Sequence, residues 1–167
     1  MNLQTALANW DGKSAGEIRS IHDRHRGEPG YPSLLIALMA VEAFRTGATW
    51  LLKALLEGGA EISPGEIETI YDQLPELDHW EQKLHLLQCM EYLPIPDAQK
   101  RSVRRFLRES LESENKFVRA WAHNGYYHLA KQYPEFQGEA EGLFAKALRD
   151  EAPSVKARIR KVILKGF

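Results

Sequence analysis

The stretch of sequence that decides the fold is Asn115-Lys-Phe-Val-Arg-Ala-Trp-Ala-His-Asn-Gly-Tyr-Tyr127. Its small and apolar residues, together with the leucine that follows, are Val118, Trp121, Ala122, Gly125 and Leu129. This spacing of i, i+3, i+4, i+7 and i+11 places them on one face of an α-helix. Three polar residues of the same stretch, Arg119, His123 and Tyr127, fall on the opposite side. The stretch therefore predicts an amphipathic helix with a buried stripe and a polar face.

A weaker copy of this helix lies near the C-terminus, at 154–162. Val155 follows Val118 by 37 residues, and Ile159 then takes the place of Ala122. Looser copies begin at Trp50 and Trp80, so that the successive offsets are 30, 38 and 37 residues. A helix pair that recurs at such a period cannot bury its apolar face alone, and neighbouring pairs stack to do so. The copies therefore predict a stacked solenoid.

Start and stop signals divide the chain into nine expected helices with short connections. Ser14 with Glu17 and Ser63 with Glu66 form capping boxes, each of which begins a helix. Gly47 is interpreted as a turn that separates a helix ending near Arg45 from a short one that follows. One N-terminal helix followed by four helix hairpins accounts for the nine. We expect an all-α fold, with residues 1–167 forming a single domain.

The composition is that of a soluble globular protein, with 44% hydrophobic and 27% charged residues. The longest apolar run, 34–41, is far shorter than the ~20 residues of a membrane span. The N-terminus has no basic segment or cleavage signal of a secreted protein. The single cysteine, Cys89, has no partner for a disulfide within the chain. We therefore expect a cytoplasmic protein that does not enter a membrane.

The net charge of −1 hides an asymmetry between the two ends of the chain. Residues 1–96 hold 7 Lys and Arg against 14 Asp and Glu, whereas residues 97–167 hold 15 against 9. The outer side of the helix that follows Asp97 carries Lys100, Arg101, Arg104, Arg105 and Arg108. Such asymmetry indicates an anionic partner at the basic end, head-to-tail self-association, or merely solvated helix faces.

The repeated segments resemble the second helices of HEAT and armadillo repeats. Phe117-Val-Arg-Ala-Trp-Ala122 and Ser154-Val-Lys-Ala-Arg-Ile159 carry the pattern of Val, a basic residue and an Ala-rich step, and Trp80-Glu-Gln-Lys-Leu-His85 is a looser version. The resemblance covers residues from about Ser33 to the C-terminus. It implies a right-handed α-solenoid (α-α superhelix) of about four HEAT-like pairs plus an N-terminal helix.

In proteins of this kind the second helices line the concave face, so the resemblance implies a binding surface at their outward positions. The predicted binding surface comprises Lys83, His85, Arg119, His123, Tyr127, Lys156 and Arg160. Basic and aromatic side chains together suit phosphate groups and bases, or an acidic peptide. The alternative for Arg119 is structural: it would brace a loop of a neighbouring repeat, with Asp78 or Glu81 as its partner.

No catalytic or metal-binding constellation is expected. His22 and His25 are spaced i, i+3, but neither they nor Cys89 match a zinc motif. No phosphate-binding glycine loop or nucleophile elbow occurs, and no cofactor is expected. Trp50, Trp80 and Trp121 fall in helical stripes and are interpreted as core residues.

These features lead to two functional hypotheses. The first is a non-catalytic scaffold that binds a protein partner or an acidic peptide segment on its concave face. The second is a nucleic-acid-binding protein, because Lys116-Phe-Val-Arg119 and Trp121 also resemble a helix start of the HEAT-like DNA glycosylases that remove alkylated bases. A sequence pI of about 6.6 is below the ~9 common among nucleic-acid-binding modules and favours the first hypothesis.

Overall fold

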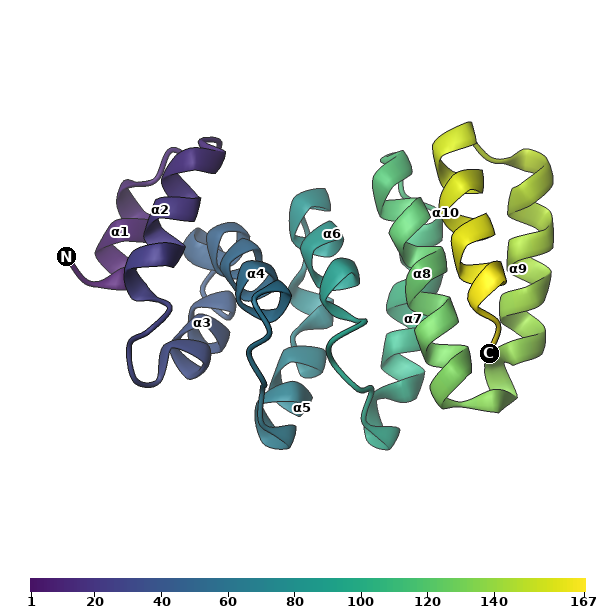
Figure 1. Ribbon diagram of the computed structural model, residues 1–167, viewed down its shortest axis with the longest axis horizontal. Helices are drawn as coiled ribbons and strands as arrows, with labels where there is room; N and C mark the ends of the chain where they lie inside the picture. Colours follow the sequence, from purple (N-terminus) through teal and green to yellow (C-terminus); the bar gives the residue numbers. More distant parts are fainter. The chain divides into compact units, whose positions relative to one another are not determined.

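The computed structural model describes residues 1–167, which are all-helical with no strand (Figure 1). The first six α-helices are α1 (Leu3–Asn9), α2 (Ala15–His25), α3 (Tyr31–Met39), α4 (Glu42–Glu57), α5 (Pro64–Asp72) and α6 (Trp80–Cys89). The last four are α7 (Lys100–Leu111), α8 (Lys116–Gln132), α9 (Gln137–Asp150) and α10 (Pro153–Lys165). Three short 3-10 helices are η1 (Leu74–Glu76), η2 (Asp97–Gln99) and η3 (Pro134–Phe136). The predicted all-α class is confirmed.

The predicted number of nine helices is wrong, because α1 is an additional N-terminal helix. The side chain of Asn2 begins it by accepting a hydrogen bond from the Thr5 N–H at 2.8 Å. Leu3, Ala6 and Leu7 are buried on its inner side. A helix of 7 residues is two turns long, which is too short to give a recognisable period in the sequence.

Two predicted helix starts are confirmed by their hydrogen bonds. At the start of α5, Ser63 Oγ accepts from the Glu66 N–H at 3.4 Å, and the Glu66 carboxylate accepts from the Ser63 N–H at 3.2 Å. At the start of α2, Ser14 Oγ accepts from the Glu17 N–H at 3.2 Å. These side chains satisfy backbone N–H groups that have no partner inside the helix.

Contacts within the chain divide it into two compact units, Met1–Cys89 and Met90–Phe167. Unit 1 contains α1 to α6 and unit 2 contains α7 to α10. A single domain over residues 1–167 stays a prediction.

Helix α4 lies at the centre of unit 1, where it contacts α1, α2, α3 and α6. Gly47 lies inside this helix, so the predicted turn at Gly47 is wrong. The break between α3 and α4 falls instead at Ala40 and Val41. A Cβ atom on Gly47 would lie 2.7 Å from Leu7 Cδ2, so glycine here allows α1 to approach α4 closely.

Arg45 is a buried cation of α4, with 6% of its surface exposed. Its guanidinium donates three hydrogen bonds to backbone carbonyls: to Met39 at 2.9 Å, to Ala40 at 3.4 Å and to Glu76 at 2.8 Å. The first two carbonyls lie at the end of α3 and the third lies in η1. Arg45 therefore ties both segments to α4 through hydrogen bonds to their backbone carbonyls.

Helix α8 occupies the centre of unit 2 and contacts α7, α9 and α10. The predicted stripe is confirmed, since Val118, Ala122 and Leu129 are fully buried. Val155 and Ile159, the matching positions of α10, are fully buried as well. The repeated pattern thus correctly identifies the apolar contact between the second helices α8 and α10.

The tryptophan predictions have mixed outcomes. Trp121 is half-buried at the edge of the stripe, and the Arg158 guanidinium lies over its ring at 4.1 Å from the centroid. Trp80 is 42% exposed at the first position of α6, so its assignment to the core is wrong. Of the described helices, none has both the length and the apolar character needed to span a bilayer.

Candidate functional site

His85 belongs to the predicted binding surface, but it lies in the core of unit 1. It is 8% exposed, and its Nδ1 is 3.0 Å from Thr49 Oγ1 on α4. Burial lowers the pKa of His85 to about 4, so the ring is neutral at pH 7. His85 therefore connects α6 to α4, and the prediction that it faces outward is wrong.

His123 and Tyr127 of α8 are also buried, with 4% and 3% of their surfaces exposed. The His123 ring lies 5.9 Å from that of Phe144, and burial lowers its pKa to about 4. The Tyr127 ring stacks on Phe167 with centroids 5.9 Å apart. The prediction that both lie exposed on the surface is wrong, because α8 is covered by three helices rather than one.

Arg119 is accessible in part, but intramolecular partners occupy its guanidinium. Nε and Nη2 donate to the two carboxylate oxygens of Glu151 at 2.8 and 3.1 Å. Nη1 donates to the carbonyls of Ser113 and Glu114 at 2.9 and 3.1 Å. The alternative prediction, that Arg119 braces a neighbouring loop, is confirmed. The prediction that its partner is Asp78 or Glu81 is wrong, because the partner is Glu151.

The remaining predicted residues are more accessible. Arg160 on α10 is exposed, and the half-exposed Lys156 donates to the Arg149 carbonyl at 3.2 Å. Lys83 is half-exposed on α6, in unit 1. Of the seven predicted residues, three are buried and one is a structural brace, so the structure does not assemble them into one surface.

A different basic surface lies on α7, the first helix of unit 2. Five cations follow its solvent side at 100, 101, 104, 105 and 108, while Val103, Phe106 and Leu107 are buried on the other side. Side chains at i, i+1, i+4, i+5 and i+8 share one broad face of a helix. This row of charges is visible in the sequence, but the resemblance to HEAT repeats implies a binding surface on the second helices instead.

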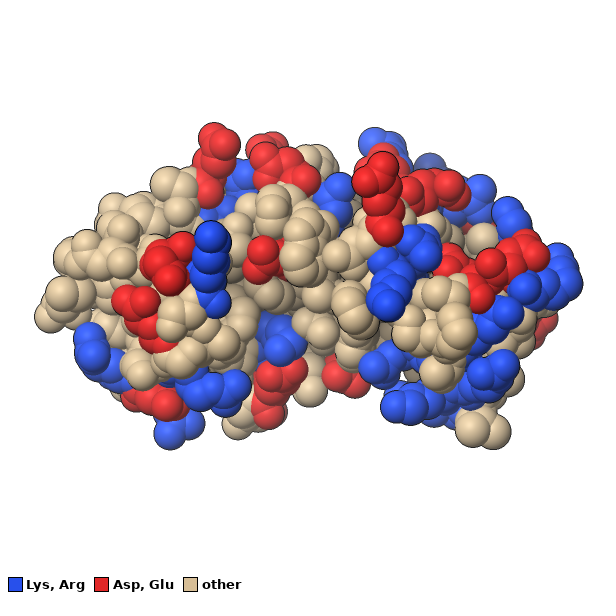
Figure 2. All heavy atoms as spheres, turned by 90° about the horizontal axis from the view of Figure 1, so that it is seen from above, with Lys and Arg blue, Asp and Glu red and all other residues tan.

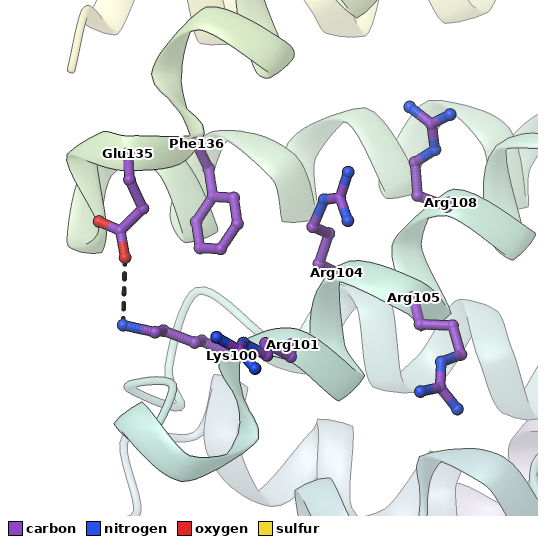
Figure 3. Close-up of a pocket in the computed structure, with 7 residues that line it drawn as sticks. All are labelled: Lys100, Arg101, Arg104, Arg105, Arg108, Glu135 and Phe136. Carbon is purple, nitrogen blue, oxygen red and sulfur yellow. Dashed lines mark ion pairs between the residues drawn. The ribbon is translucent and has the colours of Figure 1, made fainter.

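The cations of α7 border an open groove of about 600 Å³, which we call the α7 groove (Figure 3). Its lining consists of Lys100, Arg101, Arg104, Arg105, Arg108, Glu135 and Phe136. Glu135 and Phe136 come from η3, so the groove runs between α7 and the start of α9. Figure 3 shows Arg104 and Arg108 extending in one direction and Arg105 in the opposite one.

Three of these cations have carboxylate partners. Lys100 Nζ lies 2.8 Å from Asp97 Oδ1 and 3.1 Å from Glu135 Oε1. The carboxylate of Glu139 accepts two hydrogen bonds from Arg104, at 2.7 and 3.1 Å, and one from Arg108, at 3.0 Å. The hydrogen bonds from Arg104 lower the pKa of Glu139 below its usual range, so it stays ionised at pH 7.

Arg101 and Arg105 are exposed and form no ion pair. The five cations that line the α7 groove have three carboxylates beside them, those of Asp97, Glu135 and Glu139. This leaves an excess of two positive charges. Figure 2 shows Lys and Arg side chains over both parts of the chain, with more of them over the part that carries α7 to α10. The two unpaired guanidinium groups are available for carboxylates or phosphates.

The described residues contain no group of three or more His, Cys, Asp or Glu side chains that could hold a metal ion. Cys89 is buried. The two unpaired guanidinium groups of the α7 groove are donors that suit an anion by charge and hydrogen bonds.

Comparison with known proteins gave no match to a family model, a curated protein or a solved structure. The resemblance to HEAT repeats thus rests on the sequence motifs alone.

Proposed function

We propose that the protein is a non-catalytic binding module that holds an acidic segment of a partner protein in the α7 groove. The observation that carries this proposal is the pair of exposed, unpaired arginines, Arg101 and Arg105, within a groove of excess positive charge. A guanidinium is permanently charged and matches a carboxylate with two parallel hydrogen bonds. The proposed binding surface thus lies on α7, the first helix of a pair, and not on the second helices.

The size of the charged face supports a short ligand. Lys100 and Arg108 are eight positions apart, which corresponds to about 12 Å along a helix. An extended peptide rises ~3.4 Å per residue, so four or so residues span the row. The half-buried ring of Phe136 offers an apolar contact beside the charges.

Nucleic acid is the second candidate, because a guanidinium binds a phosphate as well as a carboxylate. Two observations favour the acidic peptide. The Lys100 ammonium lies 4.9 Å from the centroid of the Tyr133 ring and covers one of its faces, so that ring is a poor platform for a base. The pI of about 6.6 is also low for a nucleic-acid module.

We further propose that the helix pairs stack as HEAT-like repeats of a right-handed α-solenoid. Support comes from within each unit, where second helices of successive pairs pack on each other: α4 on α6, and α8 on α10. This is the contact through which repeats of a solenoid bury a continuous core.

Fluorescence anisotropy tests the proposed function with two labelled ligands, a short peptide of Asp, Glu and Gly and a DNA duplex, each titrated at about 50 and 200 mM salt. We expect saturable binding of the peptide at the lower salt and weaker binding of the duplex. If the duplex binds more tightly and loses affinity steeply with salt, nucleic acid is the ligand. If neither binds, the α7 groove is a solvated helix face and the proposal is wrong.

A further inference from the structure

A second hollow, which we call the α4–α6 hollow, lies in unit 1 where α1, α4 and α6 meet. Its volume is about 460 Å³, within the range of small-ligand sites. Aromatic walls come from Trp10, just after α1, and from Phe44 in the first turn of α4. The polar lining comes from the first turns of α4 and α6 and from the residues that precede α6.

The charge of the α4–α6 hollow is negative. Glu42, Asp78 and Glu81 line it, and no Lys or Arg does. Glu42 and Asp78 form no ion pair, and the nearest basic atom to Glu81 is His79 Nδ1 at 3.9 Å. The N-termini of α4 and α6 contribute about half a positive charge each. Three carboxylates outweigh them, so the hollow attracts a cation.

Gln82 provides an independent sign that a hydrogen-bond donor belongs in this hollow. Its side chain lines the hollow and the residue is only 4% exposed. The amide Nε2 donates to Thr46 Oγ1 at 2.9 Å, which fixes the orientation of the group. The Oε1 atom is buried without a hydrogen-bond partner. A buried acceptor without a donor is unfavourable, and a ligand donor removes that cost when a shift of the surrounding side chains exposes Oε1 to the hollow.

The Trp10 ring is held in place at the wall of the hollow. Its Nε1–H donates to the Ser14 carbonyl at 3.0 Å. Two of its ring carbons lie 3.4 Å from the position that a Cβ on Gly47 would take. The ring is therefore fixed by α4 on one side and by the start of α2 on the other. A fixed indole is the aromatic surface on which a flat cation stacks best.

We propose that the α4–α6 hollow binds the arginine side chain of a partner segment. A guanidinium is flat and permanently charged and carries five N–H donors without an acceptor. It therefore matches the carboxylates and the aromatic walls at once, and it donates to Gln82 Oε1 once that atom is exposed. The site shares no residue with the α7 groove and takes a ligand of opposite charge, so the failure of either proposal leaves the other standing.

The test is an NMR titration of the ¹⁵N-labelled protein with the peptide acetyl-Gly-Arg-Gly-amide, followed at the indole N–H of Trp10. The same peptide with citrulline, the neutral isostere of arginine, is the ligand control, and the lysine peptide tests the requirement for a flat cation. We expect a saturable shift with the arginine peptide alone at concentrations up to about 10 mM. No saturable shift, or equal affinity for the citrulline or lysine peptide, would overturn the proposal.

A matched pair of double variants locates the site. E42Q with D78N removes two carboxylates of the α4–α6 hollow, whereas E61Q with E68Q removes two exposed carboxylates of unit 1 that do not line it. We expect the first pair of substitutions to lower the affinity for the arginine peptide at least about tenfold, and the second pair to lower it less than about twofold. All four replaced side chains are exposed, and dispersed amide signals confirm that each variant is folded. Equal effects of the two pairs would show that the peptide responds to the overall negative charge of the protein and does not bind in the α4–α6 hollow, which would contradict the proposal.

Discussion

The Arg119 guanidinium on α8 and the Glu151 carboxylate after α9 form an ion pair with two hydrogen bonds, at 2.8 and 3.1 Å. Both side chains are about one-fifth exposed, at 22% and 19%. Arg119 also donates to the carbonyls of Ser113 and Glu114, in the connection that precedes α8. The pair therefore joins the α7–α8 connection to the α9–α10 connection within unit 2, and Arg119 is a structural residue.

Replacing Arg119 with methionine, which keeps much of the stem, should lower the free energy of unfolding by roughly 2–3 kcal/mol, because four charge-assisted hydrogen bonds are lost together. Urea denaturation measures the loss. Arg160→Met on α10 is the matched control, since Arg160 is exposed, and should change stability by less than about 0.5 kcal/mol. Equal effects of the two variants would contradict the structural role of Arg119.

Three histidines with strongly lowered pKa values should make stability depend on pH. Burial lowers the pKa of His85, His123 and His128 to about 4 in the folded protein. The unfolded chain, with a histidine pKa of about 6.5, binds more protons than the folded one between pH 6.5 and 4. The stabilisation by each neutral histidine is complete above pH 6.5 and is lost as the pH falls toward 4.

Linkage gives roughly 2 kcal/mol of lost stability per histidine between pH 7 and pH 5. His85→Gln keeps a polar side chain and should remove about 2 kcal/mol of that loss, whatever its effect on stability at pH 7. Urea denaturation at several pH values measures both. An unchanged slope in this variant would show that His85 titrates normally in the folded protein.

Gly47→Ala tests the close approach of α1 to α4. The added Cβ would lie 2.7 Å from Leu7 Cδ2, so the buried Leu7 must shift, and we expect a loss of roughly 1–3 kcal/mol. Gly142→Ala in α9 is the control, because open space surrounds that position. It should stabilise the protein by up to about 1 kcal/mol through helix propensity. A gain at both positions in thermal denaturation would contradict the packing of α1.

Arg45→Met removes the donor for three backbone carbonyls and should cost roughly 2–4 kcal/mol. Arg26→Met is the control, because Arg26 and its partner Asp23 are both more than half exposed, at 62% and 61%. Its effect should be below about 0.5 kcal/mol. Comparable losses for the two variants in urea would be inconsistent with the described role of Arg45.

Sequence reasoning was most successful where short-range rules decide the structure. The capping residues Ser14 and Ser63 act within three residues of themselves, and both are confirmed. The stripe through Val118 and Ala122 depends only on helical period, and it correctly predicts burial. All-helical folding follows from the same local preferences.

Sequence reasoning failed where a third or fourth neighbouring helix decides the environment. His123 and Tyr127 are polar residues opposite the apolar stripe of α8, a position that would face solvent if α8 had one partner. They are buried because α7, α9 and α10 all contact α8. The prediction of a turn at Gly47 is wrong for a related reason. The sequence alone does not distinguish a glycine at a close helix contact from a glycine at a turn.

The α7 groove could have been predicted in part. The five cations were visible as the outer side of one helix, but the contributions of Glu135, Phe136 and Glu139 come from residues about 30 positions further along the chain. Those residues decide which arginines are already paired. The distinction between the occupied Arg104 and the free Arg105 therefore needed the tertiary structure.

The most direct test of the α7 groove compares two double variants that remove equal charge from unit 2: R101Q with R105Q in the groove, and K156Q with R160Q at the positions predicted from the repeat pattern. Fluorescence anisotropy with the acidic peptide at about 50 mM salt gives the affinity of each. We predict that the groove pair weakens binding at least about tenfold and that the α10 pair weakens it less than about threefold. Equal weakening, or a larger effect of the α10 pair, would contradict the assignment of the binding surface to α7.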